Sequence, residues 1–320
     1  MSSRRSRPRR MIERILVGTE GSQAADNAVS TALRLARAAD AEIRAVHARE
    51  TPEGARRRSA AGRQVAHQRE RAGERVLEAV TERAGKVDVP ATTVIDDRPP
   101  AELLLAQARE WGADLLAIGA QGESGFERAI RGSVADQLIR GSPVPVLTVH
   151  QPPSTDPLDP IERLVVPSDG SSAALSAAPV ARALARATGA RLDLVFAVPP
   201  RIEGGELLGP TDDIEQAAAT LADDALAPLE RRYRGTEIER ERRVRHDAPH
   251  RAIVHHADER DADMIVMSTR GHGSLERVLL GSVVDKVLRT SNVPVVTVNP
   301  PGEDDRVASP EGQGPQGART

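Results

Sequence analysis

One glycine pattern occurs twice in this chain, at a constant separation. The first copy has the spacing G-x2-G-x9-G-S, and the second has the same spacing with serine in place of the first glycine. The positions are Gly119, Gly122, Gly132 and Ser133 in the first copy, and Ser268, Gly271, Gly281 and Ser282 in the second. Matching positions lie 149 residues apart, and the pairs Ser22 and Ser171, and Pro145 and Pro294, keep the same separation. The chain is therefore a tandem duplication of two units, each of ordinary domain size.

Each unit alternates short apolar runs with amphipathic segments. The apolar runs predict strands near residues 12–18, 42–48, 91–95, 114–119 and 144–149, and again near 161–167, 191–198, 237–244, 263–268 and 294–298. Helices are expected between them, near 22–36, 61–84, 99–111 and 132–140, and near 172–188, 212–233, 248–260 and 281–290. Apolar strands between amphipathic helices indicate a parallel sheet covered on both faces. We predict an α/β fold of two tandem repeats, each an open, Rossmann-like five-stranded parallel sheet with helices on both faces.

The composition changes at three places and divides the chain. We predict a basic, disordered tail at 1–10, a first domain at 11–150 (half one) and a Pro-rich linker at 151–160. A second domain at 161–299 (half two) and a disordered tail at 300–320 complete the chain.

Charge and composition argue against several classes of partner. The net charge is −3, so no general attraction to nucleic acid or to an anionic membrane is expected. The chain has one Trp, one Tyr and two Phe, which is poor material for stacking bases, and it has no cysteine. No apolar run approaches the roughly 18 to 20 residues that span a bilayer, so we expect a cytoplasmic protein.

The glycine patterns follow the fourth strand of each half, where ligands of parallel sheets bind. Backbone amides beside glycine can approach a polyanion closely, and the serine at the end of each pattern adds a hydroxyl donor. The spaced, repeated set therefore favours phosphate binding in at least one half. Two structural alternatives stay open: the glycine and serine pairs start helices, and Asp169 caps the helix that begins near Ser172.

The turns after the first strands, Val17-Gly-Thr-Glu-Gly-Ser22 and Val166-Pro-Ser-Asp-Gly-Ser171, complete a resemblance. Together with the glycine patterns and the order of elements, they resemble the tandem two-domain members of the universal stress protein family. The resemblance covers approximately residues 11–150 and 161–299. It implies an adenine nucleotide ligand, ATP with AMP or ADP as alternatives, with Mg²⁺ on the phosphates.

The resemblance also implies which residues hold the nucleotide. It places Glu20 and Asp169 beside the ribose, the adenine or a phosphate-bound metal, and the end of the second strand, including Phe196, against the adenine. The full set is Gly18, Thr19, Glu20, Val46, Ala48, Ile118, Gly119, Gln121, Gly122, Gly132, Ser133 and Val134 in half one, and Pro167, Ser168, Asp169, Ala197, Met267, Ser268, Arg270, Gly271, Gly281, Ser282 and Val283 in half two.

Each half departs from the family pattern once. Half one has Glu20 in place of the family's aspartate, and half two has Ser268 in place of the first glycine. Because a missing glycine acts on the phosphate cradle itself, we expect half one to bind at least as tightly as half two. The family also pairs its fifth strands, which predicts that the halves form an internal pseudo-dimer; a homodimer of the whole chain is a further possibility.

We predict an ATP-binding regulator of the stress response, with a regulatory protein partner that the sequence does not name. No residue is assigned to catalysis, because the chain has no Gly-x4-Gly-Lys-Ser/Thr motif and no recognisable hydrolase triad. A nucleotide-independent scaffold, and a slow ATPase or a protein that phosphorylates itself at Ser133 or Ser282, remain as alternatives. His250, His255 and His256 lie in one segment with His246, which we interpret as a solvated helix rather than a metal site.

Overall fold

The computed structural model describes residues 12–49, 60–120, 133–150, 156–198, 202–203, 206–207, 212–271 and 280–301. In half one the elements are β1 (Arg14–Gly18), α1 (Gln23–Ala39), β2 (Glu42–Ala48), α2 (Ala60–Gly85), β3 (Ala91–Asp96), α3 (Pro100–Trp111), β4 (Leu115–Gly119), α4 (Ser133–Gly141) and β5 (Val146–Val149). The predicted tail at 1–10, the predicted tail at 300–320 from residue 302 on, and the first half of the linker lie outside the described residues.

Half two repeats this order with two differences. Its elements are β6 (Arg163–Pro167), the 3₁₀-helix η1 (Ala174–Ala177), α5 (Ala178–Thr188), β7 (Arg191–Val198), β8 (Ile202–Glu203), β9 (Glu206–Leu207), α6 (Asp212–Arg232), β10 (Arg240–His246), α7 (Pro249–Glu259), β11 (Met264–Ser268), α8 (Ser282–Thr290) and β12 (Val295–Val298). The short β8–β9 hairpin was not predicted. Within the described ranges, no helix is long and apolar enough to cross a membrane.

The helix predicted at 172–188 is divided into η1 and α5. Pro179 stands in the first turn of α5, where a missing backbone N–H is tolerated. A continuous helix from 172 would place this proline in the helix interior, where it removes a hydrogen bond and its ring clashes with the preceding turn.

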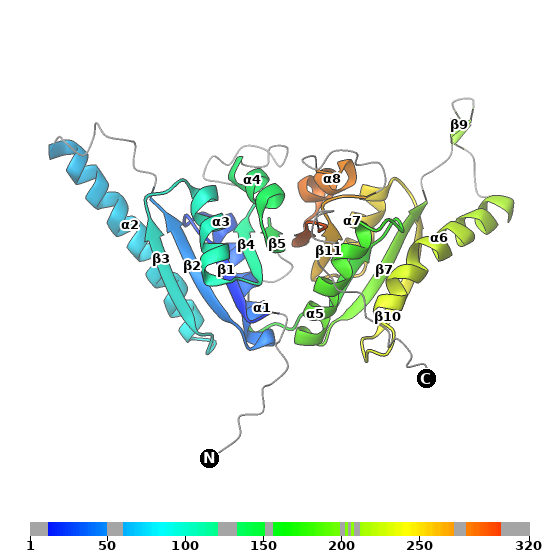
Figure 1. The fold of residues 1–320 in the computed structure, drawn as a ribbon, viewed down its shortest axis with the longest axis horizontal. Coiled ribbons are helices and arrows are strands. Elements are labelled where there is room, and N and C mark those ends of the chain that lie inside the picture. The colour runs from blue at the N-terminus through cyan, green and yellow to red at the C-terminus, as the bar shows by residue number, and fades with distance from the viewer. Residues whose placement is uncertain are drawn as a thin grey trace, which may run out of the picture.

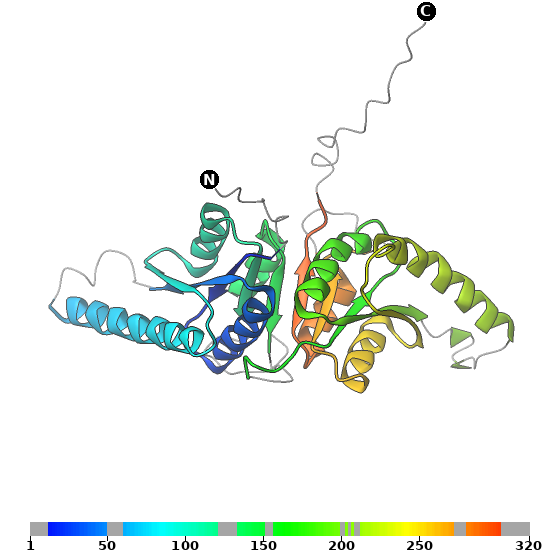
Figure 2. The same cartoon turned by 90° about the horizontal axis from the view of Figure 1, so that it is seen from below.

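Ten of the described strands form one sheet in the order β10-β7-β6-β11-β12-β5-β4-β1-β2-β3, and β8 and β9 form a separate antiparallel pair. In the ten-stranded sheet, pairing is parallel within each half, which confirms the predicted fold class. Between the halves, β5 and β12 pair antiparallel, with Leu147 opposite Val296. Figure 1 shows the two halves side by side, and Figure 2 shows their strands meeting at the centre. That the halves behave as a pseudo-dimer in solution stays a prediction.

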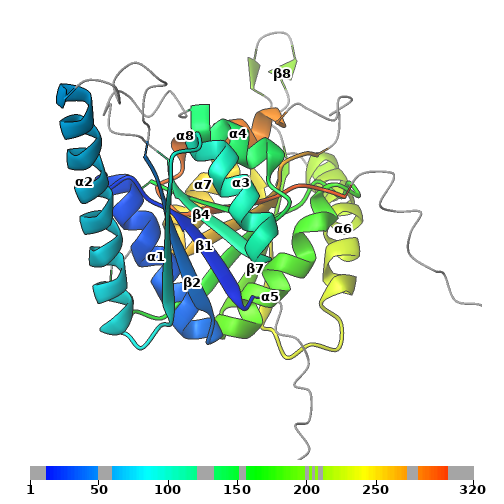
Figure 3. The same ribbon diagram turned by 60° about the vertical axis from the view of Figure 1, so that its left-hand side comes forward.

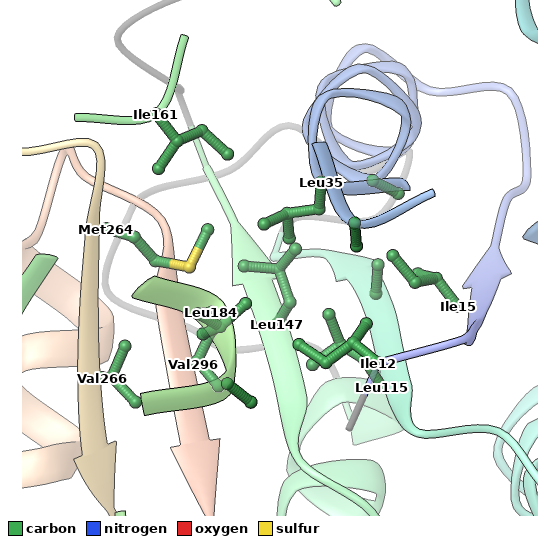
Figure 4. Close-up of a cluster of buried hydrophobic side chains, with 14 of the residues drawn as sticks. Ile12, Ile15, Leu35, Leu115, Leu147, Ile161, Leu184, Met264, Val266 and Val296 are labelled. Carbon is green, nitrogen blue, oxygen red and sulfur yellow. The ribbon is translucent and has the colours of Figure 1, made fainter. Parts of the chain in front are cut away.

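Alternate side chains of each strand enter the two cores. Ile15 and Val17 of β1 pack with α1 and α2, whereas Leu16 packs with α3 and α4 on the other face. Figure 3 shows α1 and α2 on one side of β1 and β2, with α3 on the other. The core on the α1 face continues across the boundary between the halves, where Leu147 of β5 lies near Val296 of β12 (Figure 4).

A buried ion pair also joins the halves. Arg34 of α1, whose side chain is 2% exposed, places Nη2 2.9 Å from Oδ1 of Asp263 in half two. The same guanidinium donates to the backbone carbonyls of Asp159 and Pro160 at 3.3 and 2.6 Å. Asp263 in turn accepts from the backbone N–H groups of Glu162 and Arg163. Arg34 thus fixes the end of the linker and the start of half two against half one.

Candidate functional site

A cavity of about 550 Å³ opens at the carboxyl ends of β1, β2 and β4 in half one. This is the position in the sheet where the strand order reverses, since β4 and β2 lie on opposite sides of β1. The lining includes these predicted residues: Gly18, Thr19, Glu20, Val46, Ala48, Ile118, Gly119, Ser133 and Val134. The predicted residues Gln121, Gly122 and Gly132 lie outside the described part of the chain.

The turn after β1 is held from both sides. The backbone N–H of Thr19 donates to the carbonyl of Val46 at 3.0 Å. The Thr19 carbonyl lies 2.9 Å from Nδ1 of His47, which must carry the proton to donate to it. Gly21 has φ +86°, a left-handed conformation that favours glycine. Ser22 then caps α1 by accepting from the N–H of Ala25.

Glu20 is turned toward the helix start. Its Oε1 accepts a hydrogen bond from the hydroxyl of Ser22 at 2.5 Å. A negative charge is favourable at this end of α1, because the helix dipole is positive there. Glu20 thus contacts the hydroxyl of Ser22 while it lines the cavity, whereas Asp169 of half two accepts from the backbone N–H of the matching Ser171.

The cavity also has a basic wall that was not predicted from the sequence. His47 and Arg49, from β2 and the residue after it, and Arg69 of α2 all line the cavity. Arg49 is held by Glu70, with Nη1 to Oε1 at 2.7 Å, and by Asp97, with Nε to Oδ1 at 3.1 Å. The charges that follow β2 were visible in the sequence, but the approach of Arg69 from α2 depends on how that long helix packs. Leu103 and Leu104 of α3 supply an apolar wall.

The matching residues of half two gather at the carboxyl ends of β6, β7 and β11 and at the start of α8. Those at strand ends are Pro167, Ser168, Asp169, Ala197, Met267, Ser268, Arg270 and Gly271, and those at the helix are Gly281, Ser282 and Val283. An ideal Cβ on Gly271 would lie 2.4 Å from Oδ2 of Asp169. The carboxylate therefore packs directly against the glycine backbone, and the turn and the glycine pattern meet here as predicted.

Asp169 contacts the turn that leads into η1. Its Oδ1 accepts from the backbone N–H of Ser171 at 3.0 Å, a local turn contact. The hydroxyl of Ser171 accepts from the N–H of Ala174 at 3.0 Å, and this bond serves the first turn of η1. The contact with the first turn of η1 is thus made by the serine two residues later, and a capping role for Asp169 stays an alternative.

Gly119 packs directly against the backbone of α1, a requirement that its place in the glycine pattern does not indicate. An ideal Cβ here would lie 2.6 Å from the carbonyl carbon of Ala24 and 2.7 Å from the N of Ala25, both in the backbone of α1. In half two, Ser268 occupies this place opposite η1 instead of an α-helix. Its Oγ lies 3.3 Å from Oγ of Ser176 and accepts from the N–H of Arg270. The ranking of the two halves stays a prediction, but Ser268 is accommodated rather than strained.

One polar cluster lies away from the cavity. His256 is fully buried, with Nε2 2.8 Å from Oδ2 of Asp193, so its interpretation as part of a solvated helix is wrong. Burial raises the pKa of Asp193, but the hydrogen bond from His256 and the charge of Arg163 outweigh it, and the pKa lies below its usual value. Among the described residues, no three His, Asp or Glu side chains are placed to hold a metal ion.

Comparison with known proteins agrees with this architecture. The universal stress protein family matches residues 11–150 and 160–299. Universal stress protein Rv2005c from Mycobacterium tuberculosis is 30% identical over 185 residues, covering 58% of this chain and 61% of that protein, so the chain spans about three fifths of that relative. Universal stress protein Rv2623 from the same organism is 28% identical over 224 residues, covering 69% and 72%. A universal stress protein structure from Archaeoglobus fulgidus shows the same fold, with a TM-score of 0.64 at 21% identity, covering 89% of this chain and 98% of that one.

Proposed function

The chain belongs to the universal stress protein family, with one copy in each half, and we propose that it is an ATP-binding regulator of the stress response. The observation that supports this is the cavity of half one, where the turn after β1, the end of β2, the end of β4 and the start of α4 converge. Its volume of about 550 Å³ lies within the usual range for small-molecule pockets.

The two ends of the cavity suit the two ends of a nucleotide. Ser133 begins α4, so the phosphates would lie where a helix dipole and free backbone N–H groups favour negative charge. The base would lie at the β2 end, against Val46 and Ala48. Glu20 would face a Mg²⁺ ion carried by the phosphates, and AMP or ADP would use the same contacts in part. When bound, the metal would neutralise phosphate charge.

We propose binding rather than rapid turnover. Of the described lining residues that could act as a base, Glu20 accepts a hydrogen bond from Ser22 and Nδ1 of His47 lies 2.9 Å from the carbonyl of Thr19. Phosphoryl transfer depends on groups positioned around the transferred phosphate, and we assign Glu20 to the metal and His47 to the turn after β1 rather than to a base for this step. A cytoplasmic location, a pseudo-dimer in solution and an unnamed regulatory partner complete the proposal.

The first test fills the cavity from α2. Ala72 is exposed on this helix and lines the cavity. We expect Ala72→Trp to weaken ATP binding in half one at least about tenfold, measured by isothermal titration calorimetry, since the indole occupies the base end. Mass spectrometry of nucleotide released from the denatured wild-type protein identifies the ligand.

The matched control is Ala79→Trp, on the same helix and also exposed but outside the cavity lining. It should bind ATP like the wild type. An Ala72→Trp chain with unchanged affinity and stoichiometry would show that the cavity of half one is not the nucleotide site.

A further inference from the structure

Asn299 joins half two to half one immediately after β12. Its Nδ2 donates to the backbone carbonyls of Ile139 and Ser142, at 3.0 and 3.2 Å, at the end of α4 in half one. Its Oδ1 accepts from the hydroxyl of Thr269 in half two, at 2.8 Å. One amide side chain therefore contacts both halves, and its nitrogen faces carbonyls while its oxygen faces a hydroxyl donor.

Thr269 connects the two ends of the glycine pattern in half two. It follows β11 directly and is 4% exposed. Its backbone N–H donates to the carbonyl of Val298, and its own carbonyl accepts from the N–H of Gly281, both at 2.9 Å. Gly281 precedes α8, so Thr269 fixes the start of this helix against the end of β11.

We propose that Thr269 and Asn299 are positioning residues for a nucleotide site in half two, and that half one completes this site by holding Asn299. This rests on the proposed function, because it assigns the phosphate-binding role to the same glycine pattern. Asn299 fixes the side chain of Thr269, and Thr269 fixes the amide of Gly281 next to Ser282. The carbonyls of α4 keep Asn299 in this orientation.

The same device is not repeated in half one. His150 matches Asn299 and also crosses the boundary, with Nε2 2.6 Å from the carbonyl of Leu288 in α8. However, position 120 is alanine where half two has Thr269, so it offers no hydroxyl for His150 to hold. Half one therefore supports the glycine pattern of half two through Asn299 and Thr269, and His150 does not provide the same support for half one.

The test uses the full chain carrying Ala72→Trp, so that ATP binding reports on half two. In this background we expect Thr269→Val to weaken binding about fivefold, the effect of losing one hydrogen bond. Thr269→Ser keeps the hydroxyl and should restore the parent affinity. Asn299→Ala should weaken binding at least as much as Thr269→Val, because it removes the group that α4 holds.

The matched control is Thr297→Val. Thr297 is also a buried threonine whose hydroxyl crosses the boundary, to the carbonyl of Val146 at 3.3 Å, so this hydroxyl bond ends at β5 rather than at Asn299. Thr297→Val should leave the affinity for ATP unchanged. Equal effects of Thr269→Val and Thr297→Val, or no effect of Thr269→Val, would overturn the proposal. So would an Ala72→Trp chain without any ATP binding, an outcome that still leaves the half-one site of the proposed function standing.

Discussion

Arg34→Ala is expected to lower the free energy of unfolding by roughly 3–5 kcal/mol, the usual cost of removing one member of a buried ion pair. The side chains of Arg34 and Asp263 are 2% and 13% exposed, so water does not replace the lost contact fully. The carbonyls of Asp159 and Pro160 lose their guanidinium donors as well. Urea unfolding followed by circular dichroism measures the change.

The control for this prediction is Arg37→Ala. Arg37 lies on the same helix and is exposed, so its removal should change the free energy of unfolding by no more than about 0.5 kcal/mol. If the two variants lose similar, small amounts of stability, the ion pair does not hold the halves together in solution. A separate early transition in Arg34→Ala would show that the halves have begun to unfold independently.

The repeat made the fold predictable from sequence. Each apolar run occurs in two copies at one separation, so each strand is indicated by two independent segments. Strands such as β4 and β11 end where predicted. The split of the helix at 172–188 was not predicted. Pro179 favours a break there, but Pro228 lies inside α6 without one, so a proline alone does not locate the break. The β8–β9 hairpin left no comparable signal, because each of its strands has only two residues.

Contacts between distant segments were the part that the sequence could not show. The glycine spacing placed Gly119 and Ser133 at one cavity, because both flank the same connection. Arg69 reaches that cavity from α2, and the side of α2 that faces the cavity depends on how the helix packs. His256 is buried because α7 packs on β7, where its side chain contacts Asp193. Such contacts depend on the packing of whole elements against each other and not on local spacing.

Gly119→Ser, which gives half one the residue of half two, should cost roughly 3 kcal/mol of stability, at the upper end for overpacking. The new Cβ would lie 2.6 Å from the backbone of Ala24, and relief requires α1 to shift as a whole. Half two tolerates Ser268 because η1 replaces an α-helix there and Ser176 meets the serine hydroxyl. Each half therefore has the residue that the helix packed against it allows: glycine against the α-helix α1 in half one, and serine against η1 in half two.

Two substitutions separate this explanation from a general effect of glycine replacement. Gly85→Ser, at the exposed end of α2, meets no atom within 4 Å and should change stability by no more than about 0.5 kcal/mol. Ser268→Gly loses two weak hydrogen bonds and restricts the chain less, so about 1 kcal/mol is expected. Denaturant unfolding of all three variants decides the matter. If Gly119→Ser is as stable as Gly85→Ser, α1 can yield to a side chain at this position, and packing does not explain the glycine of half one.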